Sequence, residues 1–184
     1  MRVLLDPDSI TRGLRRIAVE IIERHRGTDG LVLLGVRRGG VPIAQRIAEW
    51  VRDLEGIQIP VGSVDITLYR DDAATALPNP RIGPSEMPGP IDGKRVVICD
   101  DVVFTGRTVR AAIDAVLDYG RPRRIELAAI IDRGGRELPI QPDYVLKQVE
   151  VTRDDRVDVL DEGDGLQAVV QPVTTPSVTP PKAQ

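Results

Sequence analysis

The sequence predicts an α/β fold, in which a mostly parallel central sheet is flanked by helices and a small β-rich hood is attached. Three observations support this prediction. Short continuous apolar runs alternate along the chain with amphipathic helical segments, the turns after two of these runs are rich in glycine or aspartate, and the last third contains only short strand-like runs. Such alternation is typical of parallel strands joined by right-handed helical crossovers.

The length and composition favour one soluble domain. The chain has 184 residues, 41% of them hydrophobic, and a formal net charge of −3. This length is typical of one compact domain, which we expect to span residues 1–171. No apolar run approaches the ~18 residues of a membrane span, and residues 1–6 lack the apolar stretch of a signal peptide. We therefore expect a cytoplasmic protein with no membrane partner.

The cysteine and histidine content excludes several kinds of site. The chain has one Cys and one His, so an internal disulfide is impossible and a Cys/His zinc site or a catalytic Cys–His or Ser–His pair is disfavoured. We expect Cys99 to be a small core residue and His25 a surface cation at a helix end. Chemistry must then come from acids, arginines and backbone groups.

The first half of the chain predicts two helices and two strands. Asp6 has the form of an N-cap and Pro7 suits the first helical position, after which apolar residues recur at helical spacing as far as Gly27. Residues 31–36 (LVLLGV) form a buried-type strand, and the glycine turn Arg37 to Gly40 joins it to a second amphipathic helix. The β-branched residues that follow this helix, at positions 61–68, indicate another strand.

A proline-rich loop separates these elements from a second strand and helix unit. Residues 71–92 contain repeated prolines, and loops of this length inside a compact domain are usually functional, so we expect a mobile functional loop. Residues 95–98 (RVVI) form a buried-type strand that ends at two aspartates. A helix over residues 109–117 follows and is closed by Gly120.

The remainder predicts one further buried strand and the hood. Residues 125–131 (IELAAII) continue the alternation of the parallel sheet. From residue 172 to residue 184, Pro, Thr, Ser and Ala dominate without apolar periodicity, which predicts a disordered tail. The short strand-like runs between them are expected to form the β-hairpin cap, or hood: 144–152, 156–160 and 166–170, with a turn at 162–165.

Residues 96–108 (VVICDDVVFTGRT) carry the strongest functional signal. Two adjacent carboxylates, Asp100 and Asp101, end a buried strand, and ligands of open α/β sheets bind at the carboxyl ends of strands. The amides of the following helix can hold a phosphate, while carboxylate oxygens can accept hydrogen bonds from the vicinal hydroxyls of a ribose. The pattern therefore predicts a ribose 5-phosphate site whose phosphate loop comprises Phe104, Thr105, Gly106, Arg107 and Thr108.

Simpler or different interpretations of these motifs are less favoured. An acid pair alone is more often a cap, and Thr-Gly is often an ordinary turn, but the whole pattern is far more specific. Gly35 and Gly40 have the spacing of a nucleotide-binding P-loop, yet Val41 and Pro42 stand where Lys and Ser or Thr are required. No G-x-G-x-x-G occurs in the sequence. Nucleotide hydrolysis and dinucleotide binding are therefore disfavoured.

These residues resemble the signature of type I phosphoribosyltransferases, which bind 5-phosphoribosyl 1-diphosphate (PRPP). Residues 65–72 (DITLYRDD) and 132–139 (DRGGRELP) narrow the resemblance to the PyrR group, pyrimidine-operon regulators with uracil phosphoribosyltransferase activity. The resemblance covers residues 6–164. It implies the type I phosphoribosyltransferase fold and the conversion of uracil and PRPP to UMP and diphosphate.

The resemblance also implies roles for residues and a cofactor. Mg²⁺ would lie near Asp100 and Asp101 and be held through the substrate, with no dedicated protein cage. Arg70, at the root of the proline-rich loop, would act with these aspartates in catalysis by closing over the diphosphate. The diphosphate-binding residues are then Arg37, Arg38, Gly39 and Gly40, and the base-side residues are Phe104, Asp132, Arg133 and Val149.

The sequence departs from the PyrR pattern at several of these positions. Phe104 stands where the group has Tyr. Purine-type members often carry an acidic residue at this position, and its absence here favours a pyrimidine base. Gly135 replaces a His. The diphosphate turn reads Arg38-Gly39-Gly40 where Thr-Arg-Gly is usual, so its arginine is moved by one position.

In this group the protein binds leader RNA of the pyrimidine operon when UMP is bound. RNA binding requires a basic surface, and the candidate residues are Arg12, Arg15, Arg16 and Arg136. Departures at Arg15, Val19, Gly135 and Gln141 weaken this expectation, and mixed charge on the first helix is also typical of an ordinary solvated face. The alternatives are an RNA-binding attenuator with residual catalysis and a phosphoribosyltransferase for another base with no RNA role. We expect a homodimer or higher homo-oligomer.

Overall fold

The computed structural model describes residues 1–71, 83–161, 163 and 165–172. Part of the expected loop (72–82) and nearly all of the expected tail (173–184) lie outside the described residues. Within the described ranges, no helix has both the length and the apolar character needed to cross a membrane.

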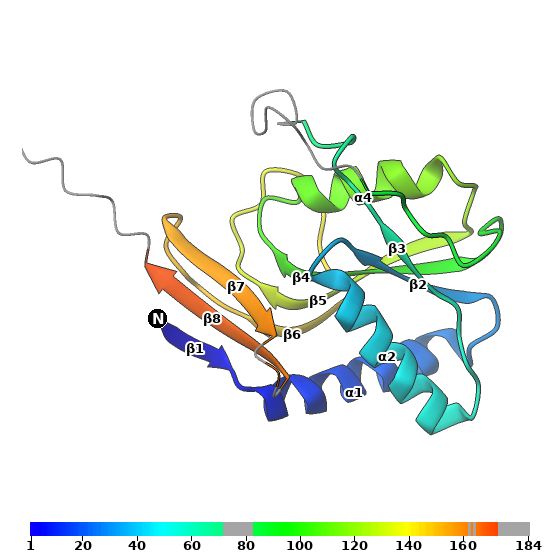
Figure 1. The fold of residues 1–184 in the computed structure, drawn as a ribbon, viewed down its shortest axis with the longest axis horizontal. Coiled ribbons are helices and arrows are strands. Elements are labelled where there is room, and N and C mark those ends of the chain that lie inside the picture. Colours follow the sequence, from blue (N-terminus) through cyan, green and yellow to red (C-terminus); the bar gives the residue numbers. More distant parts are fainter. Residues whose placement is uncertain (72–82, 162, 164, 173–184) are drawn as a thin grey trace, which may run out of the picture.

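The central element is a five-stranded parallel sheet with the strand order β3-β2-β4-β5-β6 (Figure 1). The prediction of an α/β fold with a parallel sheet is confirmed. Three strands are buried along nearly their whole length, as expected for strands covered on both faces. The strands are β2 (Leu31–Val36), β3 (Val61–Val64), β4 (Arg95–Val103), β5 (Arg124–Asp132) and β6 (Tyr144–Gln148).

Helices cover both faces of this sheet. Alternate residues of each strand point to opposite faces, so Leu33 packs in the core beneath α1 and α2 whereas Leu34 packs in the core beneath α4. Figure 1 shows α4 on one side of the sheet and the other two helices on the opposite side. The helices are α1 (Pro7–His25), α2 (Gly40–Glu55) and α4 (Arg107–Leu117).

Local signals predicted most helix and strand boundaries correctly. Asp6 caps α1, because its side chain accepts a 2.7 Å hydrogen bond from the Ser9 amide. The strand expected at 31–36 is observed with those bounds. The strand expected at 95–98 runs on to Val103, since its extension pairs with the end of β5. The strand expected at 61–68 is shorter than predicted, because the Asp65 carboxylate accepts a hydrogen bond from the Thr67 amide and turns the chain.

The hood is an antiparallel three-stranded sheet with the order β1-β8-β7. The predicted hairpin is confirmed as β7 (Asp155–Asp161) and β8 (Leu166–Pro172). Two expectations are corrected. No strand was expected at β1 (Arg2–Leu5), which pairs with β8. The segment beginning at Tyr144, assigned to the hood, instead forms β6 at the edge of the parallel sheet.

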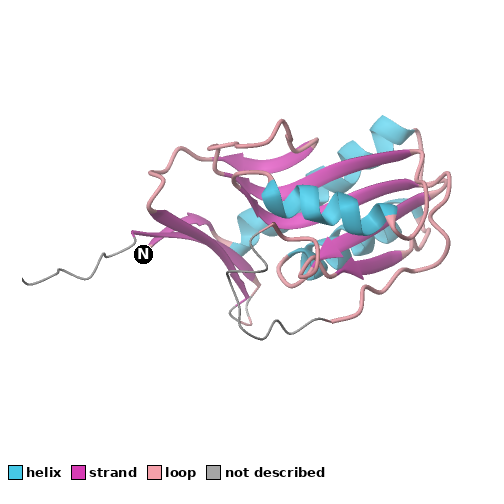
Figure 2. Cartoon of the chain, turned by 90° about the horizontal axis from the view of Figure 1, so that it is seen from above, coloured by secondary structure: helices cyan, strands magenta, loops and turns pink. Residues whose placement is uncertain are grey.

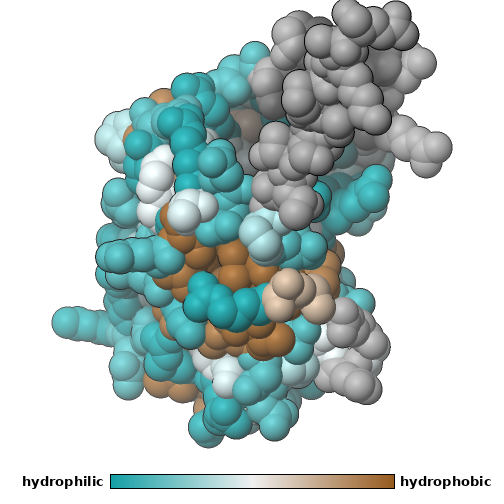
Figure 3. All heavy atoms as spheres, turned by 90° about the vertical axis from the view of Figure 1, so that its left-hand side faces the viewer, coloured by the Kyte–Doolittle hydropathy of each residue, from teal (hydrophilic) through white to brown (hydrophobic). Residues whose placement is uncertain are grey.

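The hood packs its inner face onto the rest of the molecule and leaves an apolar outer surface. Figure 2 shows the hood to one side of the central sheet. Val157, Leu166 and Ala168 belong to the same core as α1 and α2. On the outside, Val3 is 50% exposed, and Figure 3 shows apolar atoms gathered on the side of the molecule that carries the hood strands.

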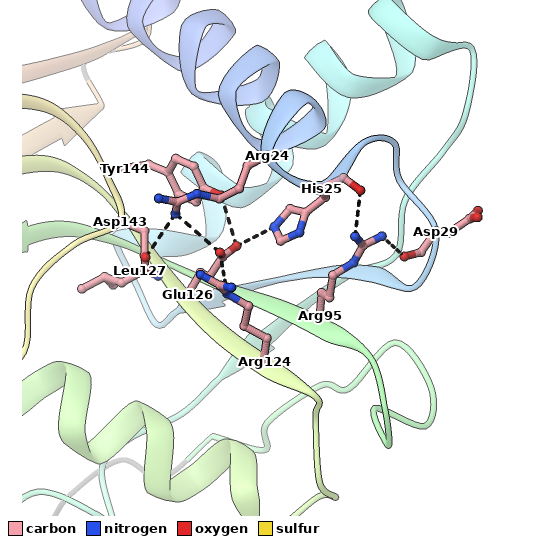
Figure 4. Close-up of polar contacts among 9 residues, drawn as sticks. All are labelled: Arg24, His25, Asp29, Arg95, Arg124, Glu126, Leu127, Asp143 and Tyr144. Atoms are coloured by element: carbon pink, nitrogen blue, oxygen red, sulfur yellow. Dashed lines mark hydrogen bonds and ion pairs between the residues drawn. The ribbon is translucent and has the colours of Figure 1, made fainter.

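A buried carboxylate ties α1 to the amino ends of β5 and β6 (Figure 4). The Glu126 carboxylate lies 2.6 Å from His25 Nε2 and 2.8 Å from Arg124 Nε, and it accepts a 3.1 Å hydrogen bond from the Tyr144 hydroxyl. The His25 side chain is only 5% exposed, so the expectation of a surface cation is wrong. We call Arg24, His25, Arg124, Glu126 and Tyr144 the Glu126 cluster.

Candidate active site

The acid pair lies near the carboxyl end of β4, as the sequence predicted. Asp100 is buried, and its burial together with the neighbouring Asp101 charge raises the pKa of its carboxyl well above the usual value. The Asp100 carboxylate accepts a 3.0 Å hydrogen bond from the Asp101 amide. The Asp101 carboxylate is partly exposed and accepts a 2.8 Å hydrogen bond from the Val102 amide.

The glycine turn after β2 packs directly against this acid pair. A Cβ on Gly39 would lie 2.5 Å from the Asp101 carboxylate oxygen, and a Cβ on Gly40 would overlap the carbonyl oxygen of Cys99. Gly40 therefore allows close approach of the two backbones, and Gly39 leaves room for the Asp101 side chain. The predicted diphosphate-binding turn and the two aspartates predicted to bind the ribose therefore lie next to each other.

The two arginines of the turn have different surroundings. Arg37 Nε donates a 3.1 Å hydrogen bond to the Ser63 hydroxyl, and Arg37 Nη2 pairs with Glu86 at 3.0 Å. Arg38 is exposed, and both arginines line a hollow of about 360 Å³ beside the turn. Because Arg37 is held by protein partners, Arg38 is the better placed of the two to meet an anionic ligand.

The predicted phosphate loop leads into the amino end of α4. Gly106, with a φ of 92°, precedes the helix and has no side chain to cap it, and the Thr105 hydroxyl accepts a long, 3.4 Å hydrogen bond from the Arg107 amide. The first amides of a helix have no intrahelical partner, so they are available to a phosphate. The Arg107 side chain, in contrast, pairs with Glu137 at 2.9 Å and with Asp71, which directs it away from the helix axis.

The segment after β5 supports the phosphate loop. The amides of Glu137 and Leu138 both donate to the Thr105 carbonyl, at 2.9 and 3.1 Å. Arg136 Nη1 donates a 2.7 Å hydrogen bond to the Phe104 carbonyl. The DRGGRELP segment therefore holds the phosphate loop in place, a supporting role that the sequence did not reveal.

The expected base-side residues lie around a hollow at the carboxyl ends of β5 and β6. The hollow has a volume of about 500 Å³, and two of the expected residues, Asp132 and Val149, line it. Phe104 and Arg133 are not among its lining residues but pack against each other close by. The lining residues that the sequence did not reveal are Gly134, Gln148 and Glu150. Correct assignment of β6 to the parallel sheet would have placed them here.

The segment that carries Arg70 is anchored on α4. Arg110 Nη2 donates a 2.6 Å hydrogen bond to the Tyr69 carbonyl, and the Tyr69 hydroxyl donates a 2.5 Å hydrogen bond to Asp118. This hydrogen bond raises the pKa of Tyr69 to about 12. Asp71 pairs with Arg107. Arg70 is thus exposed between two residues that are fixed to the helix of the phosphate loop.

The expected RNA-binding arginines are divided by the structure. On α1, Arg12, Arg15 and Arg16 are all exposed, and each has a contact within the protein. Arg12 Nη2 donates a 3.3 Å hydrogen bond to the Ser9 hydroxyl, and the Arg15 guanidinium lies 5.8 Å from the centroid of the Trp50 ring. Arg16 Nη1 pairs with Glu20 at 2.7 Å, and Arg16 Nη2 donates to the Val145 carbonyl at 3.2 Å. The Arg136 side chain, in contrast, is only 13% exposed and pairs with Asp132 at 2.8 Å.

Comparison with known proteins identifies the family. A model described as a phosphoribosyl transferase domain matches residues 4–170. A bifunctional protein PyrR of Pelotomaculum thermopropionicum is 55% identical over 168 residues, which cover 91% of this chain and 93% of the relative. A bifunctional protein PyrR of Chloroflexus aurantiacus is also 55% identical over 168 residues, covering 91% of this chain and 92% of the relative.

Solved structures show the same fold at low sequence identity. The hypoxanthine phosphoribosyltransferase of Trypanosoma cruzi has a TM-score of 0.67 and 19% identity, covering 92% of this chain and 95% of that chain. A hypoxanthine-guanine phosphoribosyltransferase from Bacillus anthracis has a TM-score of 0.61 and 15% identity, covering 82% and 83%. The fold is that of a type I phosphoribosyltransferase, and the chain belongs to the phosphoribosyltransferase family and, within it, to the bifunctional PyrR proteins.

Proposed function

We propose that the protein transfers the phosphoribosyl group of PRPP to uracil, giving UMP and diphosphate, and that it regulates a pyrimidine operon by binding leader RNA. One observation carries the enzymatic part. The glycine turn, the acid pair and the amino terminus of α4 converge at the carboxyl ends of β2 and β4. PRPP has a diphosphate, a vicinal diol and a 5-phosphate, so each of its polar parts has a matching partner.

The residues of this site bind and orient the sugar. The amides that follow Gly106 hold the 5-phosphate, and the ribose hydroxyls donate to Asp100 and Asp101. In the reaction the bond from the ribosyl carbon to the diphosphate oxygen breaks and a bond to uracil N1 forms, while N1 gives up its proton. Positive charge develops on the ribosyl carbon, and the fixed carboxylates stabilise it electrostatically.

The leaving diphosphate is bound on the opposite side of the ribosyl carbon. The turn amides of Gly39 and Gly40 and the Arg38 guanidinium neutralise its growing charge. Arg70, anchored beside α4 by its neighbours, closes over the diphosphate and excludes water.

The acid pair also fits Mg²⁺, because this ion prefers oxygen ligands and needs few carboxylates when the substrate supplies phosphates. Among the residues that the structure describes, no group of three or more His, Cys, Asp or Glu side chains could hold a metal ion. Asp100 and Asp101 would hold Mg²⁺ together with PRPP oxygens. When bound, the ion supplies charge neutralisation of the diphosphate.

A substrate panel tests the enzymatic proposal. With PRPP and Mg²⁺ we expect uracil to be converted to the nucleotide, and orotate and hypoxanthine to react far less. Phe104 provides no carboxylate to assist proton transfer to a purine, which is the reason to expect less reaction with hypoxanthine, and the resemblance to uracil phosphoribosyltransferases is the reason to expect less with orotate. A preference for hypoxanthine or orotate would support the alternative, a phosphoribosyltransferase for another base.

Arg37 and Arg38 have different surroundings, so we expect their replacement to affect the binding of PRPP differently. Replacement of Arg38 by Ala is expected to raise the KM for PRPP about 10-fold, the effect of losing one charged hydrogen bond. Replacement of Arg37 by Ala removes its hydrogen bonds to Ser63 and Glu86 and is expected to change this KM less than about 3-fold. Initial rates at varied PRPP concentration distinguish the two. The reverse order would assign diphosphate binding to Arg37.

The regulatory part rests on the family and on the exposed arginines of α1. We expect the leader RNA of the pyrimidine operon to bind more tightly in the presence of UMP. Arg16 pairs with Glu20 and Arg136 pairs with Asp132, whereas the exposed Arg12 and Arg15 form no ion pair within the part of the chain that the structure describes, so these two are the better candidates for binding RNA phosphates.

Filter binding to leader RNA at several salt concentrations tests this assignment. Replacing Arg12 and Arg15 by Ala is expected to lower the slope of log affinity against log salt by about 1 for each RNA phosphate that is no longer neutralised. The matched control is Arg156→Ala, which removes an exposed arginine of β7 and is expected to leave the slope unchanged. If the RNA affinity does not depend on UMP, the protein has no regulatory role of this kind.

A further inference from the structure

The ring of Phe104 is enclosed by the segment after β5. The Arg133 guanidinium lies 4.0 Å from the ring centroid, in a cation–π contact. On another side, a Cβ on Gly135 would overlap the ring edge and would lie 3.0 Å from Phe104 Cδ2. The ring therefore occupies the volume that any side chain at position 135 would need. We call Phe104, Arg133 and Gly135 the ring cage.

The hood holds the arginine of the ring cage in place. Arg133 Nη1 donates a 2.7 Å hydrogen bond to the Asp155 carbonyl, and Arg133 Nη2 donates a 2.9 Å hydrogen bond to the Thr152 carbonyl. These acceptors are backbone carbonyls of the first residue of β7 and of the segment that leads into it, so they fix the guanidinium without depending on other side chains. The hood therefore fixes one side of the cage. On another side, the ring can lie where it does because Gly135 has no side chain.

The ring cage borders the base-side hollow but does not fill it. Gly134, which directly precedes Gly135, lines this hollow of about 500 Å³, and Phe104 does not. Phe104 and Gly135 are also two positions at which the sequence departs from the PyrR pattern, and the structure places them in contact.

We propose that Gly135 is a positioning residue for the base site, because its missing side chain lets the Phe104 ring lie beneath Arg133 and keeps the neighbouring hollow open to the base. This inference rests on the proposed function in one respect, namely that the hollow receives uracil. The position of the ring itself does not depend on that function.

The ring position can be measured without any activity, because Phe104 is the only Phe in the chain. Protein labelled with 4-fluorophenylalanine gives one ¹⁹F resonance, which reports the surroundings of this ring. We expect Gly135→Ala to shift the resonance. The matched control is Gly93→Ala, which has the same left-handed backbone, with a φ of 67° against 72°, and open space around the added Cβ. We expect this control to leave the resonance unchanged.

Kinetics then test the role in base binding. We expect Gly135→Ala to raise the KM for uracil about 10-fold, a typical cost of steric conflict in a substrate pocket, and to change the KM for PRPP less than about 2-fold. Gly93→Ala carries the same backbone strain and lies outside the site, so it should match the wild type in both constants. In the double variant Phe104→Leu/Gly135→Ala, the smaller side chain should relieve the overlap and restore the KM for uracil. Arg133→Met opens the cage from its other side and should also shift the resonance.

The outcomes separate this inference from the proposed function. If the wild type makes no UMP, the proposed function fails, whereas the ¹⁹F spectra still test the cage. An unshifted resonance in Gly135→Ala overturns the ring cage. A shifted resonance with an unchanged KM for uracil, or with both KM values raised equally, overturns the positioning role.

Discussion

Replacement of Asp101 by Asn is expected to lower kcat for UMP synthesis about 100-fold. The substitution keeps the shape of the side chain but removes the charge that faces the ribose and the glycine turn. Loss of one preorganised electrostatic interaction with a developing charge typically costs about 10² to 10³ in kcat. Steady-state rates with saturating uracil, PRPP and Mg²⁺ measure the effect.

The control for Asp101→Asn is Asp53→Asn, which removes an exposed carboxylate on α2. We expect it to leave kcat within a factor of about 2, because exposed charges far from the site act weakly through water. Equal rates in the wild type and in Asp101→Asn would show that the acid pair does not bind the sugar.

Removal of the buried carboxylate of the Glu126 cluster is expected to destabilise the protein by about 1 to 3 kcal/mol. The Glu126 side chain is only 2% exposed and compensates the charges of Arg24 and Arg124. Glu126→Ala leaves the buried Tyr144 hydroxyl and the His25 ring without this partner, whereas Arg24 keeps Asp143 and the half-exposed Arg124 stays in contact with water, so the main cost is that of unsatisfied buried polar groups. Urea unfolding at a fixed protein concentration measures the change.

A surface ion pair provides the comparison for this variant. Glu20 pairs with Arg16 at 2.7 Å on the exposed face of α1, where both side chains are well solvated. Glu20→Ala should therefore cost less than about 1 kcal/mol. If Glu126→Ala lowered the stability no more than Glu20→Ala, the cluster would not be the link between α1 and the sheet that the geometry indicates.

Local sequence signals were sufficient for the central sheet and its helices. The nearly continuous apolar runs at 31–36 and 125–131 are distinctive because a strand covered on both faces has few polar positions, Glu126 being the exception in the second run. The Asp6 cap and the following helical periodicity likewise depend only on neighbouring residues. These are the elements for which the prediction and the structure agree.

The errors arose where pairing partners are distant in the sequence. β1 has only four residues, and its register is set by β8, more than 160 residues later. β6 is an edge strand with exposed Lys147 and Gln148, so its pattern resembles that of a hood strand. The extension of β4 to Val103 comes from pairing with β5. None of these partners can be deduced from composition or periodicity.

The same difference between local signals and distant contacts applies to the site residues. The acid pair and the phosphate loop are contiguous in the sequence, and their proximity to the glycine turn follows from the parallel sheet. The surroundings of individual arginines could not be deduced from the parallel sheet, because the backbone carbonyls that bind Arg16 and Arg136 come from other parts of the chain. A charge pattern alone therefore could not show which arginines form hydrogen bonds to distant parts of the chain.

A crystal structure with bound UMP tests the central claim most directly. We predict that the phosphate lies on the amides after Gly106, that the ribose hydroxyls bind Asp100 and Asp101, and that uracil occupies the hollow lined by Asp132 and Val149. A nucleotide bound elsewhere, with the acid pair away from the ribose, would contradict this assignment of the site.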